Sequence, residues 1–196
     1  MIKENQMYAQ INKPKKLKDK KNIDIAENKK IKLYIYGAAA AVLILMVVIG
    51  MLIEPISTMF DTTGVMMLVL RFVIVIALLA ACLYLHEYIH VLTIKKLSGE
   101  TCKIDFRKLH ACVLTDSYFS KRGYLIVSFA PVAIIGILLL LLMIILPSKC
   151  FWILYTAEIL NIAGAAGDVY TAIILLKEKG GLWIKDEGDY ITYWKR

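Results

Sequence analysis

The run "ACLYLHEYIHVLT" at residues 81–93 decides how this sequence folds, because it places three ionisable side chains inside an apolar segment. Apolar residues continue on its N-terminal side and predict a membrane-spanning helix over about residues 65–94. His86, Glu87 and His90 need partners there, since ionisable groups inside a membrane span are costly and usually mark function. The segment therefore predicts both a helix and a site.

Three further apolar blocks reach the length that a membrane span requires, at residues 33–53, 123–146 and 151–176. The 196 residues are 59% hydrophobic, with a mean hydropathy of +0.65, which is too apolar for a soluble domain of this length. Backbone groups cannot stay unpaired in lipid, so the blocks should be helices. The sequence predicts an all-α membrane protein with a four-helix transmembrane domain at 33–176.

The segments outside the spans are basic. Residues 1–32 hold ten lysines and four acidic residues, which predicts a disordered tail. Residues 95–122 hold seven Lys or Arg and the tail at 177–196 holds five, whereas the other two connections hold almost none. The positive-inside rule places both termini and the middle loop in the cytoplasm of a multi-pass protein of the cell membrane. Membrane topology thus explains the net charge of +8 without a nucleic-acid partner. The N-terminal lysines either attract anionic lipid head groups or only orient the chain.

Residues 86–90 read H-E-Y-I-H, and positions i and i+4 lie on one face of a helix. Two imidazoles at that spacing can bind one zinc ion, and Glu87 beside them can act as the base on a zinc-activated water. The alternative is a polar cluster that only joins helices, although Ser, Thr or Asn is more usual for that purpose. We therefore predict His86 and His90 as metal ligands and Glu87 as the catalytic residue.

A catalytic zinc site takes three protein ligands, and the candidates for the third are Asp168, Glu158 and His110. Depth in the bilayer separates them, since a helix rises about 1.5 Å per residue. His86 lies roughly 13 Å from the basic end of its span, and so does Asp168, whereas Glu158 lies roughly 28 Å from that end. His110 is in the loop. Depth therefore favours Asp168, in the run "NIAGAAGDVY", with ordinary small-residue packing as the alternative.

Three features around this site carry weaker predictions. Asn161 lies two turns before Asp168 and either contacts the substrate or oxyanion or makes a helix–helix hydrogen bond. Arg71 and Glu158 sit at comparable depth and are predicted to form a structural pair, directly or through water. Residues 100–116 alternate between apolar and polar side chains, which is compatible with a short β-hairpin or with a plain loop.

The chain resembles the putative zincin peptidases, a family of small bacterial membrane proteins, and is distantly similar to the site-2 intramembrane zinc proteases. The resemblance covers most of residues 84–190 and rests on "HEYIH" at 86–90 and "AAGD" at 165–168, with weaker support from "LSG" at 97–99 and "FAP" at 129–131. It implies His86, His90 and Asp168 as zinc ligands and Glu87 as the catalytic base. The Asn-Pro-Asp-Gly context of the site-2 protease aspartate is absent here.

These observations predict a membrane zinc metalloprotease of the H-E-x-x-H type that hydrolyses a peptide bond of a membrane protein or peptide, within or beside the bilayer. Two other classes compete with it. One is a zinc-binding membrane protein that works by interaction, such as a chaperone or immunity factor, for which Glu87 would have no use. The other is a small cation transporter, for which four spans are few.

Overall fold

The structure is a computed structural model that describes residues 8–11, 13–14, 17–25, 27–61, 64–100, 102–107, 110–188 and 190–195, with the backbone alone at 103–107 and 110–114. It is mostly helical, with a small sheet. The helices, including the 3₁₀-helix η1, are α2 Lys29–Ile53, α3 Ser57–Phe60, α4 Val65–Ser98, α5 Lys121–Ile145, η1 Ser148–Cys150, α6 Phe151–Gly164 and α7 Ala166–Lys177. The strands are β1 Ala9–Gln10, β2 Lys18–Asp24, β3 Lys103–Arg107, β4 His110–Leu114, β5 Tyr118–Ser120, β6 Leu182–Asp186 and β7 Tyr190–Lys195.

Four helical segments are long and apolar enough to cross a membrane, in agreement with the four predicted spans. They are Lys29–Ile53, Val65–Ser98, Lys121–Ile145 and Ser148–Lys177. A helix of 25 residues is about 37 Å long, which exceeds the roughly 30 Å of a bilayer's hydrocarbon core. Large apolar side chains are exposed along these helices, with Leu52 83% exposed, as expected where lipid tails would be the neighbours.

The chain forms two compact units. We call the first the sheet unit, which comprises Met1–Ile35, Glu87–Pro131 and Gly167–Arg196. We call the second the helical unit, which comprises Tyr36–His86 and Val132–Ala166. Each unit has its own buried cluster, and each is described by itself.

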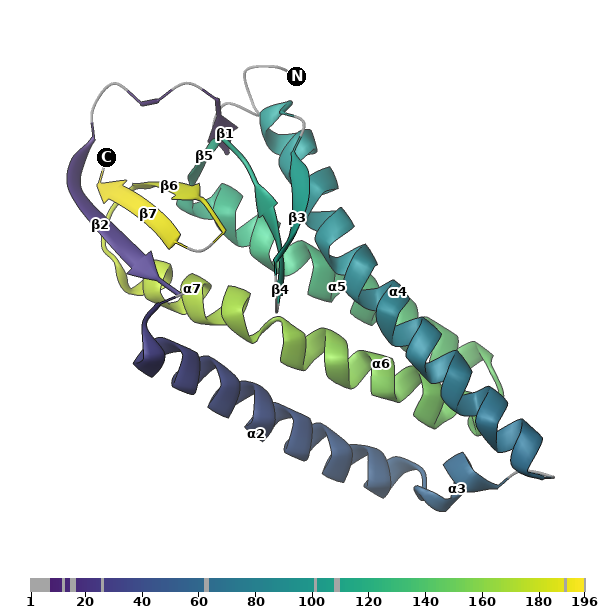
Figure 1. Ribbon diagram of the computed structural model, residues 1–196. Coiled ribbons are helices and arrows are strands. Elements are labelled where there is room, and N and C mark those ends of the chain that lie inside the picture. The colour runs from purple at the N-terminus through teal and green to yellow at the C-terminus, as the bar shows by residue number, and fades with distance from the viewer. Residues whose placement is uncertain are drawn as a thin grey trace. The chain divides into compact units, whose positions relative to one another are not determined.

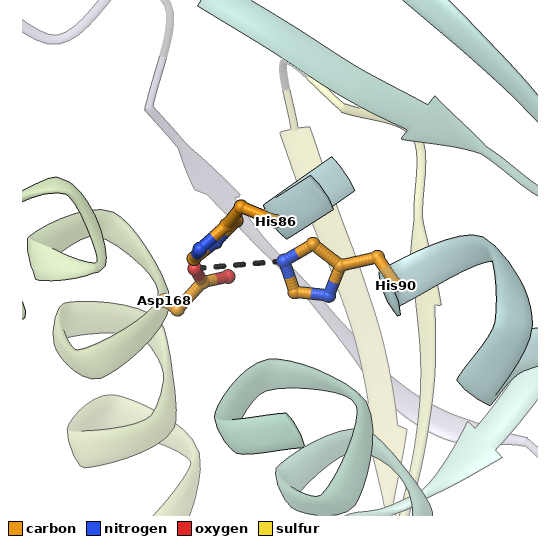
Figure 2. Close-up of side chains that lie close together, drawn as sticks. All are labelled: His86, His90 and Asp168. Atoms are coloured by element: carbon orange, nitrogen blue, oxygen red, sulfur yellow. Dashed lines mark ion pairs between the residues drawn. The ribbon is translucent and has the colours of Figure 1, made fainter. Parts of the chain in front are cut away.

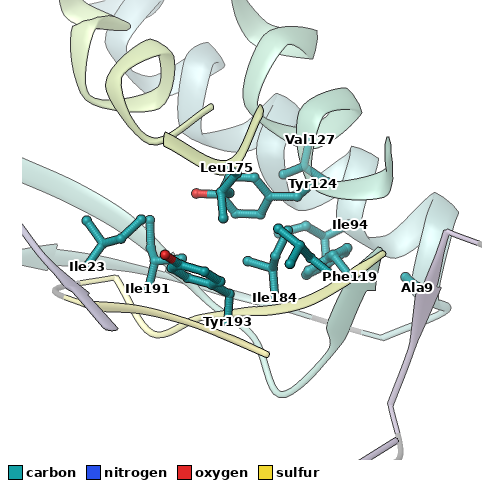
Figure 3. Close-up of a cluster of buried hydrophobic side chains, with 11 residues drawn as sticks. Ala9, Ile23, Ile94, Phe119, Tyr124, Val127, Leu175, Ile184, Ile191 and Tyr193 are labelled. Carbon is teal, nitrogen blue, oxygen red and sulfur yellow. The ribbon is translucent and has the colours of Figure 1, made fainter. Parts of the chain in front are cut away.

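The sheet unit contains five strands in the order β1-β5-β6-β7-β2, with every neighbouring pair antiparallel (Figure 1). Strands β6 and β7 read "LWIKD" and "YITYWK", in which aromatic and β-branched residues suit a half-buried pleated surface. Their apolar side chains pack with those of β5 and of the ends of α4, α5 and α7 (Figure 3). The members of this core are Ala9, Ile23, Ile94, Phe119, Tyr124, Val127, Leu175, Leu182, Ile184, Ile191 and Tyr193.

The sheet corrects two sequence-based expectations. The prediction of a disordered tail over residues 1–32 is wrong for Lys18–Asp24, which pairs with β7 in an edge position. The prediction of an all-α fold is also incomplete, because the tail at 177–196 supplies β6 and β7. Only Ile23 of the lysine-rich strand is buried, so composition gave no sign of it. A salt bridge of 2.6 Å between Lys21 Nζ and Glu178 Oε1 joins the strand to the end of the fourth span.

The hairpin allowed by residues 100–116 is present: β3 and β4 pair antiparallel from Lys103↔Leu114 to Arg107↔His110. Glu100 closes its base. Its carboxylate accepts hydrogen bonds from Thr115 Oγ1 at 2.7 Å, from the Asp116 N–H at 3.0 Å and from Ser117 Oγ. Burial raises the pKa of Glu100, but these hydrogen bonds lower it more, so its pKa falls below the ordinary 4.5.

The helical unit is held by an aromatic cluster at the start of α6. The Phe151 and Tyr155 rings stack with centroids 4.9 Å apart, and Trp152 meets Tyr155 edge-on. Trp152 Nε1 donates to Pro55 O at 3.1 Å and Tyr155 Oη donates to Met46 O at 2.8 Å, so both ring systems dock onto the α2 side of the unit. A Cβ at Gly50 would overlap the Tyr155 ring, which explains glycine there.

Candidate metal centre

His86 and His90 lie one turn apart on α4, as the spacing of the motif predicts. Asp168 lies in the first turn of α7. One ligand atom from each of these three side chains falls within 4.8 Å of the others, and Figure 2 shows the two rings and the carboxylate turned toward one another. The atoms His90 Nε2 and Asp168 Oδ2 are 3.7 Å apart. The three predicted ligands are therefore brought together.

The orientation of His90 follows from a proline in α5. His90 Nδ1 lies 3.0 Å from the carbonyl oxygen of Val127, and since a carbonyl can only accept, Nδ1 must carry the proton. That carbonyl is available because Pro131, four residues on, has no N–H to donate to it. Nε2 is thereby left with a lone pair on the side of Asp168, where it could bind a metal ion. This contact, of the kind that orients metal-binding histidines, gives the "FAP" step at 129–131 a physical role.

A break in the fourth span positions Asp168. α6 ends at Gly164 and α7 begins at Ala166, with Ala165 between them in a non-helical conformation. Asp168 thus lies in a helix's first turn, where the helix dipole favours a negative charge. A Cβ at Gly164 or Gly167 would lie in open space, so these two glycines mark the break in the helix, whereas Ala165 between them is buried.

Glu87 follows His86 directly and is half-buried. Its carboxylate lies close enough for its charge to act on the His90 ring. Asp168 is also reachable from outside, with 26% of its side chain exposed against 11% for His90. The cluster therefore combines three donor atoms, an adjacent carboxylate and access for a small molecule.

The two remaining candidates for the third ligand lie elsewhere. Among the described residues, the only group of three that can hold a metal ion is His86, His90 and Asp168, which leaves out Glu158. His110 is in strand β4, and its side chain lies outside the described atoms.

Asn161 makes a contact between helices in the helical unit. Its Nδ2 donates to Val132 O at 3.2 Å and to Glu158 Oε2 at 3.3 Å, and the side chain is 5% exposed. Of the two predicted roles, the structure contains the helix–helix hydrogen bond. A contact with substrate stays a prediction.

The predicted direct pair between Arg71 and Glu158 is absent from the described part of the chain. Arg71 Nη1 donates to the carbonyl oxygens of Thr58 and Met59 at 2.8 and 2.9 Å. These carbonyls belong to α3, a helix of four residues too short to satisfy them internally. The guanidinium finds backbone partners nearer in the chain, and Glu158 pairs with Asn161 instead.

The donor set fits a zinc ion. Zinc binds imidazole nitrogen and carboxylate oxygen at about 2.0–2.2 Å in a tetrahedron, which separates two ligand atoms by roughly 3.4 Å. The measured 3.7 Å between His90 Nε2 and Asp168 Oδ2 is close to that value. Three ligands leave a fourth position open, as in catalytic zinc sites.

The family model described as putative zincin peptidase matches residues 79–182, more than half of the chain. The chain belongs to the putative zincin peptidase family. The matched segment begins before the H-E-x-x-H motif, contains Pro131 and Asp168, and ends at Leu182 in β6, so that the candidate metal centre lies wholly within the zincin match. Neither the curated proteins nor the solved structures contain a match to the chain.

Proposed function

We propose that the protein is a zinc-dependent peptidase that cuts a peptide bond of a membrane protein or peptide, within the bilayer or at its edge. The observation that carries this proposal is the convergence of His86, His90 and Asp168 within 4.8 Å, with Glu87 beside the first of them. The family's name and the four apolar helices support the same reading.

His86, His90 and Asp168 would hold the ion, which when bound acts as a Lewis acid and makes water a better nucleophile. Glu87 takes the proton from the attacking water as the water oxygen bonds to the carbonyl carbon. As the C–N bond breaks, Glu87 returns this proton to the leaving nitrogen, so the carboxylate is regenerated. The Val127 carbonyl keeps the His90 ring in place through both steps.

We also propose that the termini and the middle loop lie in the cytoplasm. One sheet contains strands from the N-terminal segment, the middle loop and the C-terminal segment, which supports a common side for all three. The Lys and Arg residues are concentrated in these segments, which supports the cytoplasmic side. Partly exposed Asp168 then gives water a route to the site from that side.

The experiment compares Glu87→Gln with the parent protein in membranes and after purification. The proposal predicts about one zinc per chain in both proteins, together with membrane-protein fragments that appear in parent cells and vanish in the variant. Glu54→Gln, a carboxylate in the connection after α2, is the control and should behave as the parent. Identical fragments in parent and Glu87→Gln cells would contradict the peptidase and favour a zinc-binding interaction protein. Metal flux in vesicles would favour a transporter.

A further inference from the structure

Asp186, at the end of β6, holds a carboxylate whose two oxygens are both engaged. Tyr124 Oη donates to Asp186 Oδ2 at 3.0 Å, and the Gly188 N–H donates to Oδ1 at 2.9 Å. Gly188 has a φ of 80°, a left-handed conformation that lets the chain turn back toward the carboxylate. The side chain is therefore fixed in position, and the peptidase mechanism described above makes no use of it.

Tyr124 connects this carboxylate to the elements that carry the metal ligands. Its side chain is 3% exposed and packs in the sheet unit's core with Ile94, Val127 and Leu175 (Figure 3). Ile94 lies one turn after His90 on α4, and Leu175 lies two turns after Asp168 on α7, so each shares a helix face with a ligand. Val127 is the residue whose carbonyl orients His90.

The charges of this group act on one another. Burial raises the pKa of Asp186, and the negative charge of Asp168 raises it further. The hydrogen bonds from Gly188 and Tyr124 and the nearby His90 lower it by less, so the pKa of Asp186 in the metal-free protein lies above the ordinary 3.8. Asp186 thus lies within electrostatic range of two metal ligands, yet it is outside the set of atoms close enough to share an ion with them.

We propose that Asp186, held by Tyr124, is a positioning residue of the metal centre that strengthens the binding of a divalent cation from outside the ligand set. Two neutral imidazoles and the Asp168 carboxylate leave a bound divalent ion with a net positive charge, which the Asp186 carboxylate helps to offset together with the adjacent Glu87. Tyr124 fixes the distance at which this charge acts. The inference rests on the metal centre of the proposed function and does not require that the protein cut any substrate.

This assignment gives the C-terminal segment a part in the site. Residue 186 lies beyond the segment that matches the family model, which ends at residue 182. The strand that carries it is held in the sheet between β5 and β7. Because β7 is paired with β2 in turn, the N-terminal segment and the C-terminal segment together support the position of Asp186.

The test is the zinc dissociation constant of the purified full-length protein, measured by competition with a chromogenic chelator. We expect Asp186→Asn to weaken zinc binding by about 10-fold, the lower end of the effect of losing an outer partner, because Asp186 acts by its charge and through Tyr124. Asparagine keeps the size of the side chain and one of its two acceptor oxygens, and it removes the charge. Tyr124→Phe should weaken binding less and in the same direction, because the charge stays while its anchor is lost.

The matched control is Glu187→Gln, which removes a charge from the adjacent residue, an exposed one whose carboxylate pairs with Lys185. It should bind zinc as the parent does. Parent-like affinity in Asp186→Asn, or equal weakening in Glu187→Gln, would overturn the assignment. If circular dichroism shows that Asp186→Asn does not fold, the zinc affinity of Tyr124→Phe is the test instead. Parent-like zinc affinity in Tyr124→Phe would then overturn the assignment.

A second readout separates a positioning role from a merely structural one. The absorption spectrum of the Co²⁺-loaded protein should keep its four-coordinate bands in Asp186→Asn at saturating metal, while the apo proteins melt at the same temperature. Loss of stability in the apo variant with unchanged metal affinity would refute the assignment. If zinc binding depends on Asp186 but the protein cuts no substrate, the proposed peptidase activity is refuted and this inference stands. If the fragments depend on Glu87 but Asp186→Asn binds zinc as the parent does, this inference is refuted and the peptidase stands.

Discussion

Two polar clusters inside the apolar helices differ in what their side chains leave available. In the metal centre, His90 Nδ1 donates to the Val127 carbonyl and Nε2 faces Asp168, so that donor atoms from two helices converge. In the helical unit, Glu158 and Asn161 lie three residues apart on α6, and the amide nitrogen of Asn161 is shared between the Glu158 carboxylate and Val132 O. The first cluster converges on a point that an ion can occupy. The second makes its hydrogen bonds within a helix pair and leaves the buried Asn161 Oδ1 without a partner among the described residues.

The comparison shows that an ionisable residue in a span is not by itself evidence of a catalytic site. The hydrogen bond from the Asn161 amide, at 3.3 Å, offsets part of the cost of burying Glu158. What distinguishes the metal centre is the direction of its lone pairs. The predictions below test that distinction.

The largest expected effect comes from removing a ligand. His90→Ala should weaken zinc binding by more than about 100-fold, because losing a ligand costs more than losing an outer partner. Glu158→Gln, which removes a buried carboxylate from the other cluster, should leave the zinc content unchanged. Zinc per chain, measured by elemental analysis, checks both. The comparison fails if the two variants lose zinc to the same extent.

The next effect is on stability. Asn161→Ala removes the donor shared by Val132 O and Glu158, and it should lower the free energy of unfolding by about 1–3 kcal/mol. Thermal unfolding in detergent measures this loss. Zinc affinity and proteolytic fragments should stay as in the parent protein. A folded Asn161→Ala variant that no longer produces fragments would instead assign Asn161 to the substrate or the oxyanion.

A smaller effect is expected at the proline of α5. Pro131→Ala restores an N–H that competes with His90 Nδ1 for the Val127 carbonyl. Zinc binding should weaken by up to about 10-fold, while α5 itself gains a hydrogen bond. Pro147→Ala, in the connection after α5, is the control and should bind zinc as the parent does. An unchanged dissociation constant in Pro131→Ala would show that the carbonyl does not orient the ring.

The smallest effect concerns a carboxylate outside the spans. The hydrogen bonds to Glu100 lower its pKa below the ordinary 4.5, so its contribution to stability is present above about pH 4.5 and is lost as pH falls through the lower folded-state pKa. Glu100→Gln should remove this part of the acid dependence. Unfolding curves at pH 6 and at about pH 3.5 measure it. An equal pH dependence in parent and variant would rule out this role for the hairpin base.

Much of the fold follows from the sequence because membrane spans have a strong signature. Four apolar runs gave four helical spans whose ends differ from the predicted ones by a few residues, although the fourth is broken at Ala165. The lysine-rich β2 gave no such signature, since it is an edge strand with Ile23 as its one buried residue. Its pairing depends on the distant β7, and a local pattern carries no information about such a partner.

The candidate site likewise has features that a local sequence pattern predicts and features that only the fold reveals. The spacing of His86 and His90 is local, and depth selected Asp168 because a helix has a fixed rise. A proline at position 131 predicts that the carbonyl four residues earlier lacks its helical hydrogen bond. Which side chain donates to that carbonyl depends on which helix packs against α5. Asp186 lies in "IKDEGDY", a polar stretch of a tail, and only the sheet brings it to the centre. Arg71 was assigned to Glu158 by depth, whereas the structure gives it the nearer carbonyls of α3.

The most direct test of the shared metal ion is X-ray absorption at the zinc edge of the purified protein. The account predicts nitrogen and oxygen ligands at about 2.0–2.2 Å, with a multiple-scattering signal from two imidazoles that falls to one in His86→Ala. A sulfur shell at about 2.3 Å, or an unchanged spectrum in that variant, would contradict it, because the ion would then be held by other residues.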